Sequence, residues 1–249
     1  MTIELEAHGP VTVMRIRGGK ANSMNQALLD DLHRTLDQVK DAPALVITGE
    51  GSAFSAGLAL PELVELDHAS MQTFIDRFEQ VMLQVLTFPG ATVAAINGHA
   101  IAGGCVLALM CDTRVMVNDS GMKIGLNEVA LGIGLPATVI EPLRLRVPPQ
   151  SLARIALDGT LFGPNEAHGV HLVDEVIAAP RLVPRCIEVA TPRAAHPIAY
   201  AQIKQALQWQ TVEALKRNRA QLRDQWVEAW FSEDAQTTLR TAVARITKR

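Results

Sequence analysis

AAINGHAIAGGCVLALMCD, residues 94–112, is the stretch that decides the fold of this chain. The β-branched and small apolar residues 92–96 predict a buried strand, which ends at the turn Asn97-Gly98. Gly103-Gly104 then opens an apolar run that has no charged residue before Asp112, as is typical of a buried helix. Glycines at a helix start let another group approach the backbone N–H donors that point outward there. We therefore expect a strand, a turn that presents N–H donors, and a buried helix.

A second segment, KIGLNEVALGIG at residues 123–134, contains a single carboxylate, Glu128, among apolar residues. No other charged side chain lies between Lys123 and Glu141. Such a glutamate is either an exposed loop charge or a group held in an apolar pocket. In a pocket, burial would raise its pKa and make it a better proton carrier near neutral pH. Together, the donors and a buried carboxylate indicate stabilisation of an oxyanion and transfer of a proton.

Length and composition fit one large α/β domain, or such a domain with a helical appendage. The 249 residues are 48% hydrophobic and 20% charged, which is ordinary for a globular protein and sufficient for a core. A net charge of −3 and an aromatic content of 4% are not those of a nucleic-acid-binding surface. We therefore expect no nucleic-acid partner.

Neither a metal site nor a membrane segment is expected from the sequence. The three cysteines are too few and too scattered for a disulfide framework or a zinc site. The histidines are spread along the chain, and the pair His168 and His171 has no third ligand nearby. The start MTIELEAHGP has no signal-peptide core, and no uninterrupted apolar run has the length of a membrane span. The expected location is the cytoplasm.

Strand and helix patterns alternate through most of the chain, which predicts a layered α/β core. The predicted strands are residues 11–16, 45–48, 92–96, 113–117 and 172–178. Ser23 and Gln26 form a capping-box pattern before a helix that extends to Val39. Ser70 is the expected cap of a second amphipathic helix, residues 71–86.

The last quarter of the chain carries helical periodicity and alternating charges. The predicted helices are residues 199–208, 212–230 and 234–246. All three tryptophans, Trp209, Trp226 and Trp230, lie in this last quarter of the chain. They either form an interface with another subunit or complete the core of their own subunit, and both alternatives stay open at the level of sequence.

Nucleotide and serine-hydrolase motifs are missing from the sequence. No stretch matches the P-loop pattern G-x-x-x-x-G-K-[ST], the dinucleotide pattern G-x-G-x-x-G after a strand, or the nucleophile elbow G-x-S-x-G. The glycine-rich segments therefore do not indicate phosphate binding.

Three segments in order resemble the signatures of the crotonase superfamily, the enoyl-CoA hydratases and isomerases. They are GEGSAFSAGLALPEL (49–63), AAINGHAIAGGCVLALMCD (94–112) and IGLNEVALGI (124–133), and the resemblance extends over essentially the whole chain. It implies an α/β fold, a spiral of β-β-α units, with the acyl-CoA site in residues 1–195. It also implies a helical C-terminal region, residues 196–249, that covers the CoA site and mediates assembly into a homotrimer or a dimer of trimers.

The resemblance also implies the positions of the site residues. In the family, two backbone N–H groups hold the thioester oxygen of an acyl-CoA as it becomes an enolate, and the matching residues are Leu58 and Gly103. Because both donors are backbone groups, a leucine at position 58 keeps this role. The substrate is expected to lie along the segment Ala56, Gly57, Leu58, Ala59 and Leu60, with Gly103 at the thioester and Asn127 beside the acyl group.

The catalytic carboxylates distinguish reactions within the family. Hydratases resemble one another in having two glutamates, and at the corresponding positions this chain has Val106 and Glu128. A double-bond shift needs one base, whereas addition of water needs a second carboxylate, so the pattern is similar to that of Δ3,Δ2-enoyl-CoA isomerases. Two further possibilities are different enolate chemistry, such as hydration or decarboxylation, and a non-catalytic acyl-CoA-binding role. The resemblance implies no cofactor other than the CoA of the substrate.

Two further expectations concern the CoA moiety. Position 59 is usually aspartate in the family, so Ala59 changes the expected contacts with CoA. Lys204 and residues near Phe231 are candidates for contacts with the CoA phosphates.

Overall fold

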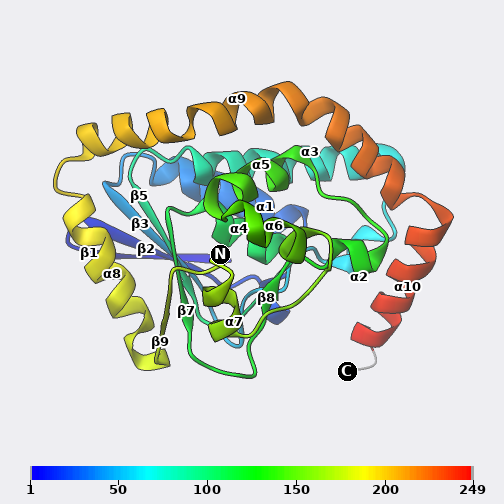
Figure 1. The fold of residues 1–249 in the computed structure, drawn as a ribbon, viewed down its shortest axis with the longest axis horizontal. Coiled ribbons are helices and arrows are strands. Elements are labelled where there is room, and N and C mark those ends of the chain that lie inside the picture. The colour runs from blue at the N-terminus through cyan, green and yellow to red at the C-terminus, as the bar shows by residue number, and fades with distance from the viewer. Residues whose placement is uncertain (1, 248–249) are drawn as a thin grey trace.

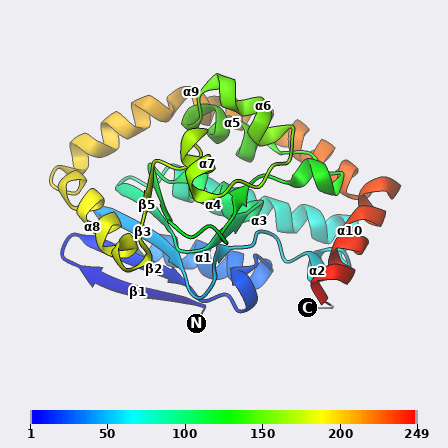
Figure 2. The ribbon, with the colours of Figure 1, turned by 60° about the horizontal axis from the view of Figure 1, so that its bottom comes forward.

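A six-stranded sheet runs through the computed structural model, which describes residues 2–247 (Figure 1). Its strands are β1 (Ile3–His8), β2 (Val11–Ile16), β3 (Ala44–Gly49), β5 (Ala91–Ile96), β7 (Thr113–Val117) and β9 (Glu175–Ile177). They are ordered β1-β2-β3-β5-β7-β9, and β1 forms the outer edge (Figure 2). All neighbouring strands are parallel except the antiparallel pair β1 and β2.

The central strands are buried on both faces. Every residue of β3 and β5 is buried. On one face, small side chains such as Val46 and Val93 pack against helix α8 (Leu182–Arg193), and the other face points into the main core. Strands that are covered on both sides have continuous apolar sequences, which is why these two were predictable.

A second sheet consists of three short parallel strands, β4 (Ala53–Ser55), β6 (His99–Ile101) and β8 (Ile124–Gly125). Each short strand follows a strand of the large sheet and is followed by a helix or 3₁₀ turn, so the chain repeats a β-β-α unit. The helical elements that follow these strands are α2 (Leu60–Leu63), α4 (Gly103–Met110) and the 3₁₀ turn η2 (Glu128–Leu131). Since the ends of adjacent parallel strands meet at one edge, these three segments are brought together.

The remaining helices surround the two sheets and complete the expected α/β fold with its C-terminal helices. They are α1 (Gln26–Gln38), α3 (His68–Leu86), α5 (Ala137–Arg146), α6 (Pro149–Ala156), α7 (Pro164–Gly169), α9 (Pro197–Trp230) and α10 (Glu233–Thr247). Two further 3₁₀ turns are η1 (Lys20–Asn22) and η3 (Ala179–Arg181). Helix α9 extends across the molecule over α5, and α10 turns back at its end (Figure 1).

Helix starts and one strand differ from the sequence-based predictions. Asn25 caps α1, because its side chain accepts a hydrogen bond from the Leu28 N–H at 3.0 Å, and Asp67 caps α3 through the Ser70 N–H at 2.8 Å. The expected caps Ser23 and Ser70 were therefore wrong by two or three residues, since Asn and Asp have the same capping ability as Ser. Strand β1 was not predicted, because its outer face is exposed and its sequence is only weakly apolar.

The C-terminal region also differs in part. Residues 197–230 form one continuous helix, in place of the two that were predicted. Trp226 and Trp230 are buried at 4% and 0% exposure, whereas Trp209 is 59% exposed. Two tryptophans therefore complete the core of their own chain, and one remains on the surface.

Lys204 ties α9 to the sheet through a buried ion pair. Its Nζ donates to Asp112 Oδ2 at 2.8 Å and to the Gly90 carbonyl oxygen at 3.1 Å. Asp112 also accepts hydrogen bonds from Arg146 and Tyr200. Burial raises the pKa of the Asp112 carboxyl, but the charge and hydrogen bond of Lys204, together with the charge of Arg146, hold it below the usual value. The expectation that Lys204 contacts CoA phosphates is wrong, because its side chain is buried and its ammonium group is already paired.

Candidate active site

Glycines allow the start of α4 to pack directly on the segment that follows β4. A Cβ atom at Gly104 would overlap the carbonyl oxygen of Ser55. Gly57 has φ +87°, and a Cβ there would lie 2.6 Å from the Ile101 carbonyl oxygen and 3.1 Å from the Gly103 nitrogen. Only glycine tolerates both the positive φ and the lack of space for a Cβ atom at position 57. The backbones around Gly57 and Gly103 are therefore in contact.

Two backbone N–H groups at this contact have no acceptor within the described residues. Met24 bonds on both sides of Leu58: its N–H donates to the Gly57 oxygen at 2.7 Å, and its oxygen accepts from the Ala59 N–H at 2.9 Å. This pairing directs the Leu58 N–H away from Met24. The Gly103 N–H is the first of α4 and lacks a partner within its own helix. The helix dipole makes this end favourable for developing negative charge.

Glu128 begins the 3₁₀ turn η2 and is 8% exposed. Its Oε2 atom has no hydrogen-bond partner among the described residues, and the same holds for Oδ1 of Asn127. Burial raises the pKa of the Glu128 carboxyl from its usual 4.5 to about 7, against the smaller lowering effect of hydrogen bonds from the backbone of Glu128 and Asn127. A group with this pKa exchanges a proton readily near neutral pH.

The C-terminal helix holds this turn in place. Gly132 ends the turn with φ +75°, and a Cβ there would lie 3.2 Å from the Ala235 Cα of α10. The Ile133 N–H also donates to the Glu128 carbonyl oxygen at 3.2 Å. The position of the carboxylate therefore depends on contacts from distant parts of the chain.

One narrow cavity of ≈ 30 Å³ brings the predicted catalytic residues together. Leu58, Gly103 and Glu128 all line it, and so does Val106. Val106, the residue that the sequence resemblance aligns with the second glutamate of hydratases, is 1% exposed. Among the described residues that line this cavity, Glu128 is the sole ionisable one.

The other predicted substrate residues lie beside the cavity instead of lining it. Ala56 donates its N–H to the Ala21 oxygen at 2.9 Å, Ala59 precedes α2, and Leu60 is the first residue of that helix. Asn127 precedes Glu128 directly. Their predicted contacts with CoA stay predictions.

The buried Asn22 was not predicted as a functional residue, and it organises the loop before the site. Its side-chain amide donates to the carbonyl oxygens of Glu50 and Ala53, and its Oδ1 accepts from the Gly18 N–H. Asn22 has φ +51°, a conformation that asparagine tolerates better than most residues. Its position after Gly18-Gly19 and Lys20-Ala21 was the available signal, because asparagine in such a stretch indicates a turn.

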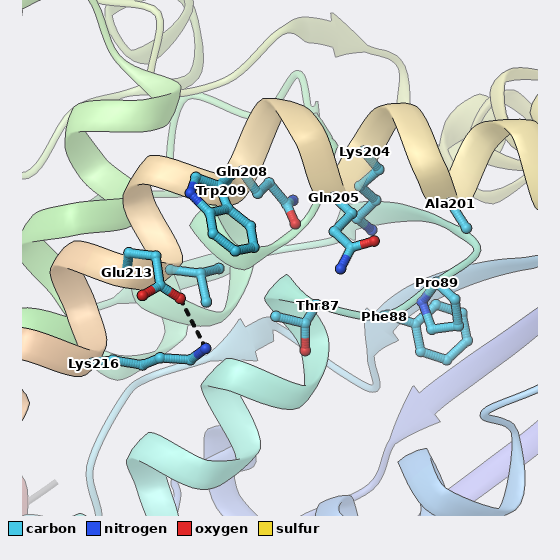
Figure 3. Close-up of a pocket in the computed structure, with 11 residues that line it drawn as sticks. Thr87, Phe88, Pro89, Ala201, Lys204, Gln205, Gln208, Trp209, Glu213 and Lys216 are labelled. Atoms are coloured by element: carbon cyan, nitrogen blue, oxygen red, sulfur yellow. Dashed lines mark hydrogen bonds and ion pairs between the residues drawn. The ribbon is translucent and has the colours of Figure 1, made fainter.

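A larger hollow of ≈ 320 Å³ lies elsewhere, between α9 and the turn from α3 to β5 (Figure 3). Lys204 and Gln208 face it from α9, and Glu213 and Lys216 form an ion pair of 2.9 Å at its side. The charged groups among the described residues that line this hollow are all in ion pairs. Leu58, Gly103 and Glu128 do not line it. The smaller cavity at Glu128 is therefore the better candidate for catalysis.

Neither a metal site nor a membrane helix is apparent in the described part of the chain. Residues 2–247 contain no group of three or more His, Cys, Asp or Glu side chains placed to hold a metal ion. No helix within the same residues combines the length and apolarity needed to cross a membrane.

Comparisons with known proteins identify the family of this chain. A model of the family "Enoyl-CoA hydratase/isomerase" matches residues 6–243. The mouse protein "Enoyl-CoA delta isomerase 1, mitochondrial" is 33% identical over 78% of this chain and 69% of its own length. The Escherichia coli 2,3-dehydroadipyl-CoA hydratase is 31% identical over 88% of this chain and 86% of its own.

Among solved structures, the human mitochondrial Δ3,Δ2-enoyl-CoA isomerase superposes with a TM-score of 0.94 and 26% identity, covering 100% of this chain and 99% of the human one. The family match and the similarity of the fold lead to one conclusion. This chain belongs to the enoyl-CoA hydratase/isomerase family, which has the crotonase fold, and is an enzyme of that family.

Proposed function

We propose that the protein is a Δ3,Δ2-enoyl-CoA isomerase, which converts a 3-enoyl-CoA into the trans-2-enoyl-CoA. The observation that carries the proposal is the single ionisable side chain among the described residues of the cavity. Glu128 shares the cavity with Leu58 and Gly103, and a valine occupies the position where a second carboxylate would act. The mouse and Escherichia coli relatives are an isomerase and a hydratase at similar identity, so the choice between these reactions depends on Val106.

In the proposed reaction, the thioester oxygen accepts hydrogen bonds from the N–H groups of Leu58 and Gly103. The Glu128 carboxylate removes a proton from C2, and the electron pair moves into the thioester to give an enolate conjugated with the double bond. The same carboxyl then returns the proton to C4, and the double bond is left between C2 and C3. The donors stabilise the negative charge that develops on oxygen, which is the main electrostatic contribution expected of such a site.

Hydration is the second candidate reaction within the family. It requires one group to deprotonate water and another to protonate carbon, and the apolar Val106 can do neither. Decarboxylation and binding without turnover are further candidates within the same family. No cofactor is needed for the double-bond shift, because the proton that leaves C2 is the one that returns at C4.

Two substrates of equal chain length test the proposal. We expect kcat/KM for isomerisation of 3-hexenoyl-CoA to exceed that for hydration of trans-2-hexenoyl-CoA by at least about 100-fold, since the missing general acid/base is worth roughly 10²–10⁴. Both reactions can be followed by absorbance of the conjugated thioester. Faster hydration would contradict the assignment, and tight binding without turnover of either ester would favour a non-catalytic role.

The pH dependence follows from the raised pKa of Glu128. The carboxylate form is the base, so kcat/KM for a 3-enoyl-CoA should rise tenfold per pH unit below about 7 and reach a plateau above it. Initial rates from pH 5 to pH 9 measure this profile. A midpoint near the usual glutamate pKa of 4.5 would show that the free carboxyl is solvated.

Self-association and location belong to the same proposal. Large apolar side chains are exposed on the first half of α9, with Ile198 77%, Leu207 72% and Trp209 59% accessible. These residues support an interface within a homotrimer or a dimer of trimers, with residues 196–249 as the region that mediates assembly and covers the CoA site. Cytoplasmic location remains a proposal, and the name of the mouse relative assigns that protein to mitochondria.

A further inference from the structure

Apart from the Glu128 carboxylate and the backbone N–H groups of Leu58 and Gly103, the active-site cavity is closed by apolar side chains from three helices. Ile75 and Phe78 come from α3, Val139 from α5 and Trp226 from α9. The volume is ≈ 30 Å³. One water molecule needs at least about 10–15 Å³ by this measure, so the free space at the closed end of the cavity is small. The structure therefore has room for a short acyl group and no more.

Trp226 is the largest of these closing side chains, and its position is fixed. It is 4% exposed, and its ring lies 5.3 Å from the ring of Trp230 at an interplanar angle of 33°. Trp230 is completely buried one helical turn further along α9. A ring packed in this way does not swing aside without losing much of its buried surface.

A buried polar cluster fixes the helix that carries Trp226 against the other two walls. Glu79 of α3 is 2% exposed and accepts hydrogen bonds from Thr138 Oγ1 of α5 at 2.8 Å and from Arg219 Nε of α9 at 2.6 Å. Separating a buried carboxylate from its partner is costly, because the remaining charge is left unpaired. The three helices are thus joined at one point.

The members of this cluster are neighbours of the wall residues in sequence. Glu79 follows Phe78, Thr138 precedes Val139, and Arg219 is two turns before Trp226 on α9. A second contact, Arg223 Nη1 to Asp76 Oδ1 at 2.8 Å, lies one turn before Trp226 and adjoins Ile75. Movement of any one wall would therefore break a polar contact behind it.

We propose that Trp226 closes the acyl cavity and restricts the enzyme to CoA esters of short acyl chains. The proposal rests on the proposed acyl-CoA substrate and names its length class. A longer acyl chain would have to displace the indole or remain in water. In either case the added methylenes would not give the increase in affinity that burial of a methylene normally provides.

Binding of saturated acyl-CoAs tests the length limit separately from catalysis, since these esters cannot isomerise. We expect the affinity measured by calorimetry to rise about fourfold per methylene from butanoyl- to hexanoyl-CoA. It should rise no further for octanoyl- and decanoyl-CoA. In Trp226→Leu, octanoyl- and decanoyl-CoA should bind at least about tenfold more tightly than to the wild type, because several methylenes become buried. Butanoyl-CoA should change less than about threefold.

Trp209→Leu is the matched control, because Trp209 lies on the same helix, is 59% exposed and does not line the cavity. Its affinity profile should stop rising at the same chain length as that of the wild type. Val139→Ala is a smaller change that also enlarges the cavity, and it serves if Trp226→Leu does not fold. Should both cavity variants be unfolded, the wild-type series decides the question by itself.

Three results would overturn the length limit. The first is a wild-type affinity that keeps rising through decanoyl-CoA, and the second is a folded Trp226→Leu protein with an unchanged profile. Both leave the isomerase assignment intact, because it depends on Glu128. The third is absence of binding by every ester, which would overturn the length limit and the proposed function together. Conversely, a length limit combined with dominant hydration would support the role of Trp226 and reject isomerisation.

Discussion

Glu128→Gln should lower the turnover of a 3-enoyl-CoA by at least about 10³-fold, since one carboxyl is proposed to carry out both proton transfers. Glutamine has nearly the same shape as glutamate and cannot accept the C2 proton at neutral pH. The Leu58 and Gly103 N–H groups are untouched, so the affinity for a saturated acyl-CoA should stay within about threefold. Steady-state kinetics and calorimetry on the same preparation measure both quantities.

Stability provides an independent measure of the same residue. The pKa of Glu128 is higher in the folded protein than in the unfolded chain, so the folded state binds more protons between pH 4.5 and about 7. The free energy of unfolding therefore falls as the pH rises through this interval. Glu128→Gln removes this loss and should be more stable than the wild type at pH 8 by about 3 kcal/mol, with much less difference at pH 5.

Glu141→Gln is the control for removal of a buried glutamate. Glu141 is 7% exposed, but its Oε1 accepts hydrogen bonds from Arg144 and Asn218, and it does not line the Glu128 cavity. Turnover in this variant should remain within about threefold of the wild type. If Glu128→Gln kept similar activity, the base would have to be another group and the proposed mechanism would fail.

Gly57→Ala should reduce kcat/KM by at least about 10²-fold, which is the cost of losing one donor of an oxyanion hole. The new Cβ would lie 2.6 Å from the Ile101 carbonyl oxygen and 3.1 Å from the Gly103 nitrogen. Both contacts are backbone atoms that cannot rotate away, so the turn or the start of α4 must shift. Either shift separates the Leu58 and Gly103 N–H groups from a shared oxygen.

Gly51→Ala separates this effect from backbone strain. Gly51 has φ +75°, close to the φ +87° of Gly57, but a Cβ at Gly51 meets nothing within 4 Å. Both variants should lose about 1–2 kcal/mol of stability from the left-handed conformation. Only Gly57→Ala should lose activity. Equal activity of the two folded variants would show that the approach of Gly57 to Gly103 is unimportant for the reaction.

Local patterns were sufficient for most of the regular structure. β3 and β5 were predictable because strands covered on both faces are continuously apolar, and the helical start at Gly103-Gly104 was visible as two glycines before an uncharged run. β1 was missed because only part of one face is buried, and the cap of α3 was misplaced because Asp67 and Ser70 can both cap a helix. The sequence-based predictions thus failed where a strand carries a weak apolar pattern and where two nearby residues can both cap a helix.

The resemblance to a family placed the site residues, and the contacts around them follow from the sequence only in part. Glu128 was noticeable as a lone carboxylate in an apolar segment, but its burial comes from the surrounding elements, α10 among them. Lys204 appeared to be a free cation near the site, and in the fold it is buried against Asp112. A charged residue on a helix has the same local signal in both situations, because its partner is distant in the chain.

By itself, the sequence determined the elements and the chemical groups available: an apolar strand, a glycine-fronted helix, a single carboxylate and a valine at residue 106. The tertiary structure decided which of them meet. Leu58, Gly103 and Glu128 line one cavity because they follow the adjacent parallel strands β4, β6 and β8. Trp226 closes that cavity from a helix near the C-terminus. The physical reason is that periodicity defines the buried face of an element, whereas the partner of that face is set by the packing of the whole chain.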